Sequence, residues 1–218
     1  MLALSCNSGE SDPSKPETLT DIDGNVYETV QIGNQTWMVE NLKTTKYNDG
    51  IDIITGGDDN WFRDEGRFQW ASTTDLNNAV EQDLPSDYYG IIYNYAAIET
   101  GKLAPEGWRV PTEADWNELI AHLQDNGYLN LEGKALKSTS GWVSDGNGYD
   151  AFGFNALPAG YVDTFGTPKV DGIVANWVAM DQDSEFTYLT INLLNSDDEI
   201  LVADASTWFG TSVRLIKE

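Results

Sequence analysis

The chain contains few of the residues on which most active sites depend. Of its 218 residues, one is cysteine (Cys6) and one is histidine (His122). A single cysteine excludes a disulfide framework, a cysteine-rich zinc site and a Cys-x-x-Cys redox pair. Helical spacing places His122 on the same polar face as Asp115 and Glu118, so we expect it in solvent and not beside a nucleophile. We therefore expect no enzyme activity and no cofactor.

Basic residues and long apolar runs are also scarce. The chain has 12 Lys plus Arg against 36 Asp plus Glu, which gives a formal net charge of −24 at pH 7. A surface of this charge repels nucleic-acid phosphates and anionic membranes, so we expect no nucleic-acid partner. No stretch reaches the roughly 18 apolar residues of a membrane span. We expect contact with a membrane only through an N-terminal lipid.

The first residues resemble the lipidation signal of a bacterial lipoprotein. Leu2-Ala3-Leu4-Ser5 precedes Cys6, and a segment rich in Ser, Pro and Glu follows. In such lipoproteins the cysteine carries the lipid, and a segment this polar cannot bury enough surface to fold. Five residues are too few for a complete signal peptide, so we expect the gene to start upstream of Met1. The alternative is that Cys6 is a free thiol.

The rest of the chain has the composition of a globular domain. Eight Trp, ten Tyr and seven Phe occur together with 20 Gly, which favours short strands and turns over a helical bundle. We predict a tether over residues 1–18 and one domain over residues 19–218. The lipid would hold this domain at the outer membrane, facing the cell exterior or the periplasm, and we expect a monomer.

Two segments have a clear local pattern. Alternating residues on both sides of Gly33-Asn34 predict a β-hairpin with a primed turn. Thr112 and Asp115 have the spacing of a capping box, which predicts one well-capped helix over about residues 112–125. Apolar residues at helical spacing give this helix its buried face: Trp116, Leu119, Ile120 and Leu123.

The other segments are less regular. Residues 44–88 show no sustained period and predict long irregular loops, whereas residues 89–98 fit either a buried strand or the start of a buried helix. A short helix is predicted near 132–137, turns rich in Gly and Asp after Trp142, and strands over 188–193, 200–203 and 211–216. Strands at both ends of the chain predict an α+β fold whose N- and C-terminal strands lie near each other in one sheet.

Five blocks of residues, in this order, resemble the Fibrobacter succinogenes major paralogous domain family. They are Asp-Gly-Asn-Val-Tyr at 23–27, Ile-Gly-Asn-Gln-Thr-Trp-Met-Val-Glu-Asn-Leu at 32–42, Gly-Trp-Arg-Val-Pro-Thr at 107–112, Phe-Asn-Ala-Leu-Pro-Ala-Gly-Tyr at 154–161 and Ser-Val-Arg at 212–214. The resemblance spans about residues 20–218. More distantly, the third and fifth blocks resemble C-type-lectin-like and formylglycine-generating folds. This implies a C-type-lectin-like mixed fold of short β-strands whose middle loops carry any ligand.

The chain also departs from the family pattern. Ala104 and Leu215 stand where family members often have cysteines, which implies a dispensable disulfide. Val178 and Ala179 stand where the family often has two serines. Oxidase chemistry of the formylglycine-generating kind needs active-site thiols, which Cys6 in a tether cannot provide.

The resemblance to C-type-lectin-like folds places a ligand loop at residues 177–186, just before a predicted late strand. Trp177 would stack on the ligand, and nearby carboxylates would accept hydrogen bonds from hydroxyls or bind a cation. Trp61 and Trp70 lie in similar Gly/Asp-rich loops, and core packing is the alternative for each Trp. The predicted ligand-contacting residues are Trp177, Asp181, Asp183, Glu185, Trp61 and Trp70.

These observations predict a non-catalytic extracellular domain for binding or adhesion, with a glycan or a surface protein as ligand. The alternatives are a structural or fimbria-associated surface component, which a flat hydrophobic edge would favour, and a glycan-degrading accessory enzyme, which needs two carboxylates at a set distance. Segments 21–25 and 57–60 resemble Ca²⁺ loops but lack the twelve-residue spacing, so we predict turns there and no metal site.

Overall fold

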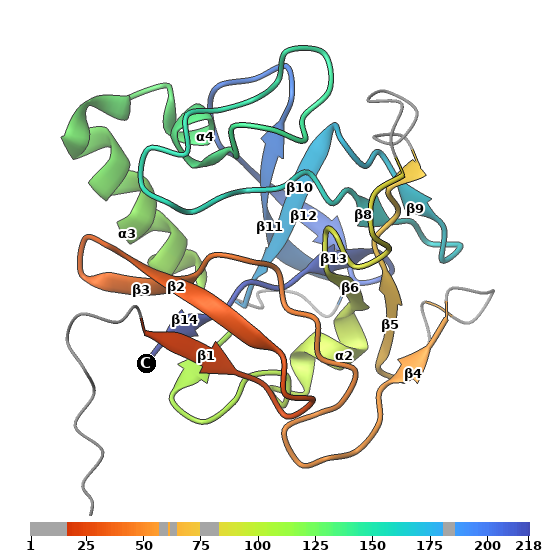
Figure 1. The fold of residues 1–218 in the computed structure, drawn as a ribbon. Helices are drawn as coiled ribbons and strands as arrows, with labels where there is room; N and C mark the ends of the chain where they lie inside the picture. The colour runs from red at the N-terminus through yellow and green to blue at the C-terminus, as the bar shows by residue number, and fades with distance from the viewer. Residues whose placement is uncertain (1–16, 57–60, 62–64, 75–82, 181–185) are drawn as a thin grey trace, which may run out of the picture.

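The computed structural model of the chain describes residues 17–56, 61, 65–74, 83–180 and 186–218. Figure 1 shows two β-sheets with a few short helices beside them, so the predicted mixture of strands and helices is present. Strands form most of the regular structure, and the fold is therefore mostly β.

The first sheet contains both ends of the described chain. Its strand order is β1 (Thr18–Thr20), β2 (Val26–Ile32), β3 (Gln35–Met38), β14 (Ile216–Lys217) and β7 (Trp108–Arg109). β2 and β3 form the predicted hairpin, and Gly33 in its turn has a φ of +61°, which glycine adopts at little cost. Ile216 pairs with Trp37 on one side and Arg109 on the other. The predicted pairing of terminal strands is confirmed (Figure 1).

The second sheet is larger. Its strand order is β12 (Leu201–Ser206), β11 (Thr187–Leu194), β10 (Val174–Ala179), β13 (Gly210–Ser212), β6 (Ile91–Asn94), β5 (Arg67–Trp70) and β4 (Ile54–Thr55). β8 (Tyr161–Val162) pairs with β13 and with β9 (Pro168–Lys169). The prediction of turns between Trp142 and the late strands is wrong at 174–179, because this segment forms β10 near the middle of the sheet.

Residues 89–98 combine the two structures that the sequence left open. β6 is buried along its length and runs directly into helix α2 (Tyr95–Glu99). Asn94 stabilises the transition from strand to helix, because its side chain accepts a hydrogen bond from the backbone N–H of Ala97 and caps the helix. The same side chain donates to the carbonyl oxygens of Trp61 and Glu65, which holds the preceding loop against the strand.

The capped helix and the short helix after it are both confirmed. Helix α3 (Glu113–Leu123) begins with the Thr112–Asp115 capping box and buries Trp116, Leu119 and Leu123. A π-helical turn, η1 (Gln124–Tyr128), ends it at Gly127, whose φ is +91°. Helix α4 (Glu132–Leu136) then follows.

Asp115 joins the helix start to strand β7. Its carboxylate accepts two hydrogen bonds from the guanidinium of Arg109, at 2.5 and 2.7 Å, and two from the backbone N–H and hydroxyl of Thr112, both at 2.7 Å. Burial by itself raises the pKa of Asp115, but these hydrogen bonds outweigh it and lower the pKa to about 2.

We expect Asp115→Asn to lower the free energy of unfolding at pH 7 by about 1–2 kcal/mol, the upper part of the range for a helix cap. A carboxyl group whose pKa is lower in the folded state than in the unfolded state stabilises the fold at pH values above its unfolded-state pKa. This stabilisation is lost as the pH falls through the folded-state pKa. The difference between Asp115→Asn and the native chain should therefore shrink between about pH 4 and pH 2 in urea titrations. Glu118→Gln, the same charge change on the exposed face of α3, should show little difference at either pH.

The prediction for His122 needs correction. His122 is half-buried and not fully in solvent, because its ring packs edge-on against Phe152 at 5.8 Å between centroids. It also lies against the hairpin turn, where a Cβ on Gly33 would come within 2.9 Å of the imidazole Nδ1. Helix α3 is therefore packed against the hairpin through this residue.

Candidate functional site

One face of strands β10, β11 and β12 forms the floor of a groove. Asn176 of β10 lies opposite Asn192 of β11, and Thr190 of β11 lies opposite Ala203 of β12. Alternate residues of a strand point to the same face, so these four side chains share one side of the sheet. The groove has a volume of about 360 Å³, which is within the range of roughly 300–1,000 Å³ for small-molecule sites. We call it the β10–β12 groove.

Hydrogen bonds fix the polar side chains of the floor. The Nδ2 of Asn176 donates to the Oδ1 of Asn192 at 2.5 Å, and the Nδ2 of Asn192 donates to the Oγ1 of Thr190 at 3.1 Å. Thr190 in turn donates to the carbonyl oxygen of Ala203 at 2.9 Å. Among the described residues, the side-chain oxygen of Asn176 accepts no hydrogen bond, so the network leaves one acceptor for a ligand.

Aromatic side chains form one wall of the groove. Tyr161 of β8 and Phe209, just before β13, meet edge to face with ring centroids 5.7 Å apart, and both line the groove. Deeper in the sheet, Tyr188 stacks on Tyr95 of α2 at 4.9 Å. Burial raises the pKa of Tyr188, so its hydroxyl stays protonated, and it donates to the carbonyl oxygen of Phe209. This bond ties the aromatic wall to the floor.

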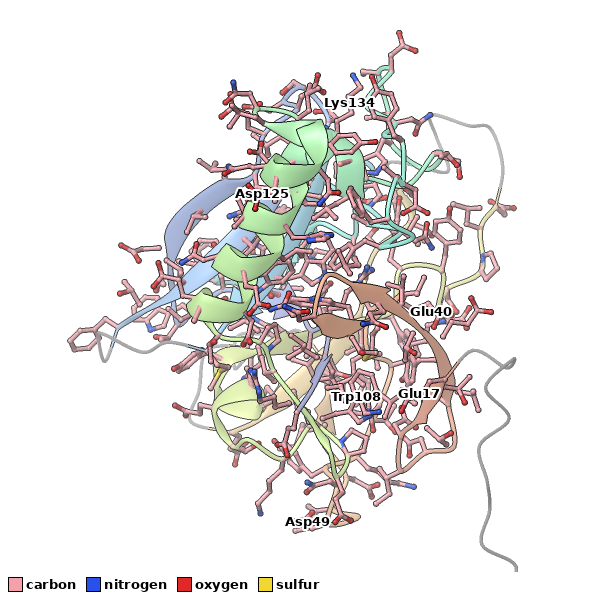
Figure 2. All side chains as sticks on the ribbon, turned by 90° about the vertical axis from the view of Figure 1, so that its left-hand side faces the viewer. Glu17, Glu40, Asp49, Trp108, Asp125 and Lys134 are labelled. Atoms are coloured by element: carbon pink, nitrogen blue, oxygen red, sulfur yellow. The ribbon has the colours of Figure 1, made fainter. Side chains whose placement is uncertain are left out.

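Acidic side chains are spread over the surface instead of being gathered at the groove. Figure 2 labels Glu17, Glu40, Asp49 and Asp125, which come from four different segments of the chain. The part of the chain that the structure describes holds no group of three or more His, Cys, Asp or Glu side chains placed to bind a metal ion. It also contains no helix long and apolar enough to cross a membrane.

The Asp-rich segment 21–25 forms a turn, as predicted. Asp21 accepts hydrogen bonds from the backbone N–H and side-chain amide of Asn25 and, at 2.6 Å, from the hydroxyl of Tyr27. Asp23 accepts from the backbone N–H and hydroxyl of Thr45. Both carboxylates are thus used by the turn and its neighbours. The second predicted turn, 57–60, lies outside the described residues.

A comparison with protein families identifies the chain. The family model for the Fibrobacter succinogenes major domain matches residues 30–217. The chain belongs to this family. No curated protein and no solved structure matches it.

Three of the sequence blocks typical of the Fibrobacter succinogenes major domain meet at one buried side chain, Arg214. Its guanidinium carbon lies 4.3 Å from the centroid of the Phe154 ring and 5.3 Å from that of Trp177. Its N–H groups donate to the carbonyl oxygen of Phe154 and, at 3.3 Å, to the Oδ1 of Asn41. These blocks therefore specify the core of the domain, and they overlap the groove only at Tyr161.

The structure places the three predicted Trp residues in different environments. Trp177 is 1% exposed on β10, and its Nε1 donates to Asn41 at 2.8 Å, so the prediction of a ligand-stacking Trp in a loop is wrong. Trp61 is fully buried against Ile92 and Ala159, and its predicted role as a ligand contact is also wrong. Trp70 ends β5 and is 38% exposed, but it does not line the groove. Asp181, Asp183 and Glu185 lie outside the described residues.

The sequence of β10 and β11 contains a signal for the groove. In β11, Thr190 and Asn192 alternate with Leu189, Ile191 and Leu193, and in β10 Asn176 is followed by Trp177. Period-two alternation of polar and apolar residues predicts a strand with one face in the core and one face that meets solvent or a ligand.

Proposed function

We propose that this chain is a non-catalytic extracellular domain for binding or adhesion, held at the outer membrane by a lipid on Cys6. The β10–β12 groove carries the proposal, because it combines a concave surface, fixed polar groups and an aromatic wall, as ligand sites commonly do. The ligand is a glycan or part of a protein on a neighbouring surface. The C-type-lectin-like class belongs to the same proposal, and the pairing of the terminal strands and the irregular connections support it.

The lining of the groove supports binding without catalysis. Among the described residues, Asp204 is the one acidic residue that borders the groove, and by the alternation along β12 its side chain points to the other face, as that of Val202 does. Glycoside hydrolysis needs two carboxyl groups roughly 5–10 Å apart, one to donate a proton and one to attack or to activate water. The described residues place no such pair of carboxyl groups on the floor of the groove, so a binding domain is better supported than a glycan-degrading enzyme.

A side chain that fills the groove should abolish binding. Ala203 lies on the floor and Val202, the next residue of β12, points to the other face. We expect Ala203→Tyr to lose ligand binding on an array of glycans and surface-protein extracts, whereas the matched variant Val202→Tyr should bind like the native chain. Urea unfolding of both variants checks that the fold is kept. Equal binding by the two variants would move the site away from the groove.

The edge of the second sheet favours one other candidate, a structural component of a surface assembly. Among the described strands, β12 pairs only with β11, and its Leu201 and Val202 are 50% and 41% exposed. The N–H of Thr207 donates to the carbonyl oxygen of Phe186. Hydrogen-bonded and non-hydrogen-bonded pairs alternate along two antiparallel strands, so Val202 and Ile191, five positions further along, form a non-hydrogen-bonded pair. The N–H of Val202 therefore points away from β11. An open edge of this kind can pair with another chain.

Proline at this edge would separate the two candidates. Proline is tolerated where the N–H points to solvent, so Val202→Pro should fold and should break any assembly through β12 while groove binding persists. Sedimentation of the native chain and of Val202→Pro over a range of concentrations measures this. We expect both proteins to sediment as monomers.

The lipid anchor has its own test. Metabolic labelling with a palmitate analogue should label the native protein and should not label Cys6→Ser, because the thiol is the acceptor. The unlabelled variant should also leave the membrane fraction. Equal labelling of both proteins would contradict the anchor.

A further inference from the structure

We propose that the ligand of the β10–β12 groove is an uncharged polysaccharide. Its hydroxyls would hydrogen-bond to Asn176 and Asn192, and one sugar ring would lie against the aromatic wall of Tyr161 and Phe209. This inference rests on the proposed function, because it names the ligand class of the same groove.

The amide pair on the floor is the first step of the argument. Asn176 is 8% exposed, and burying an amide is costly unless its hydrogen bonds are made. The neighbouring pair in the same register, Val174 and Leu194, is apolar and would be the ordinary choice for a packed sheet. An amide has a donor and an acceptor side by side, which matches a sugar hydroxyl that donates and accepts. The network from Asn176 to Thr190 holds both amides in place before any ligand arrives.

The aromatic wall supplies the second half of sugar recognition. A pyranose ring has C–H groups on one face and hydroxyls around its edge, so it needs an apolar surface beside polar groups. Tyr161 and Phe209 give that surface beside the asparagines, and Leu201 extends it at the open side of the groove. Because the edge-to-face contact orients both rings, binding costs little side-chain entropy.

Charge selects among the possible ligands. Among the described residues, no lysine or arginine lines the groove, and the one charged residue at its border is Asp204. Carboxylated or sulfated glycans are normally held by lysine or arginine side chains, and here they would instead meet a chain with a net charge of −24. Size favours a small ligand over a protein, because the volume of about 360 Å³ lies in the range of roughly 300–1,000 Å³ for small-molecule sites. An uncharged sugar chain fits both observations.

The test uses the full chain with Cys6→Ser, so that it stays in solution, and titration calorimetry with defined polymers. The probes are neutral glucan, mannan, xylan and galactan oligosaccharides, polygalacturonate as the acidic polymer and chitosan as the basic one. We expect at least one neutral series to bind. Asn176→Leu and Tyr161→Ala should each weaken that binding by about tenfold or more, since each removes a direct contact. Asn117→Leu, which removes an exposed amide from α3, should leave it unchanged.

Each of the other outcomes would refute a specific part of the proposal. Binding of polygalacturonate or chitosan alone, lost in Ala203→Tyr, would refute the uncharged ligand and leave the groove as the site. Binding of a neutral sugar that Ala203→Tyr does not affect would refute the groove and the inference together. No binding to any of these polymers would refute the inference, and a protein ligand lost in Ala203→Tyr would still support the groove. If Asn176→Leu fails to fold, Ala203→Tyr and Tyr161→Ala carry the test.

Discussion

Replacing Trp116 with alanine should lower the free energy of unfolding by about 3–5 kcal/mol, a large share of the roughly 5–15 kcal/mol that stabilises an ordinary domain. Trp116 is fully buried, and its ring lies 4.7 Å from Trp37, 6.0 Å from Phe154 and 5.9 Å from Trp177, centroid to centroid. Its removal leaves a cavity where helix α3 meets both sheets. Urea unfolding followed by tryptophan fluorescence and by circular dichroism measures the change.

The next residue of the helix is the control. Asn117 is exposed, so Asn117→Ala should change the unfolding free energy by less than about 0.5 kcal/mol. His122→Ala should fall between the two variants, because that ring is half-buried against Phe152. If Trp116→Ala and Asn117→Ala shifted the urea midpoint equally, the packing of α3 described above would be wrong.

Replacing Arg214 with alanine should cost a similar amount, about 3–5 kcal/mol, for a different reason. The side chain is 1% exposed, and burial lowers its pKa to about 9, so the guanidinium remains charged at pH 7. Its removal opens space beside Phe154 and Trp177 and takes hydrogen-bond donors from Asn41 and from a buried backbone carbonyl. Thermal and urea unfolding at pH 7 measure the loss.

Two variants separate the contributions of volume and of hydrogen bonding. Arg214→Met keeps most of the volume but has no donors, and Arg214→Lys keeps the charge but cannot stack as a plane or donate to Phe154 and Asn41 together. We expect both variants to be clearly less stable than the native chain. Lys217→Ala, which removes an exposed cation three residues later, should cost at most about 1 kcal/mol. If Arg214→Met were as stable as the native chain, packing alone would account for the contribution of Arg214 to stability.

The sequence predicted the elements whose signals are local. The Gly33-Asn34 turn and the Thr112–Asp115 capping box each involve backbone conformation and hydrogen bonds within a few residues, so the pattern contains most of the physics. The pairing of the terminal strands was predicted from their positions alone. Residues 89–98 could not be assigned, because a buried strand and a buried helix have similar composition. The side chain of Asn94, which caps the helix at Ala97, also bonds to the carbonyl oxygen of Trp61, which is distant in sequence.

The candidate site was predicted poorly because it depends on neighbours that are distant in sequence. Asn176 and Asn192 face each other only after β10 and β11 pair, and Tyr161 and Phe209 come from two further segments. Trp177 was misassigned because Gly172, Asn176 and the acids after it have the composition of a loop, while the burial of the ring follows from the contacts with Asn41 and Arg214. Residues that contact a ligand do not differ in composition from residues that contact a core.

Strand β14 has a consequence for how the chain reaches its folded state. Ile216 pairs with Trp37 and with Arg109, so the first sheet cannot close until a loop of almost the whole domain has been brought together. The entropy of closing so long a loop must be overcome before the contact is gained, and chains rich in such distant contacts fold slowly, in milliseconds to seconds. The pairing of β3 with β14 therefore has to wait until residues 216–217 have been synthesised. A chain shortened by its last five residues should lose both Arg214 and this pairing, and should be a target for proteases throughout its length.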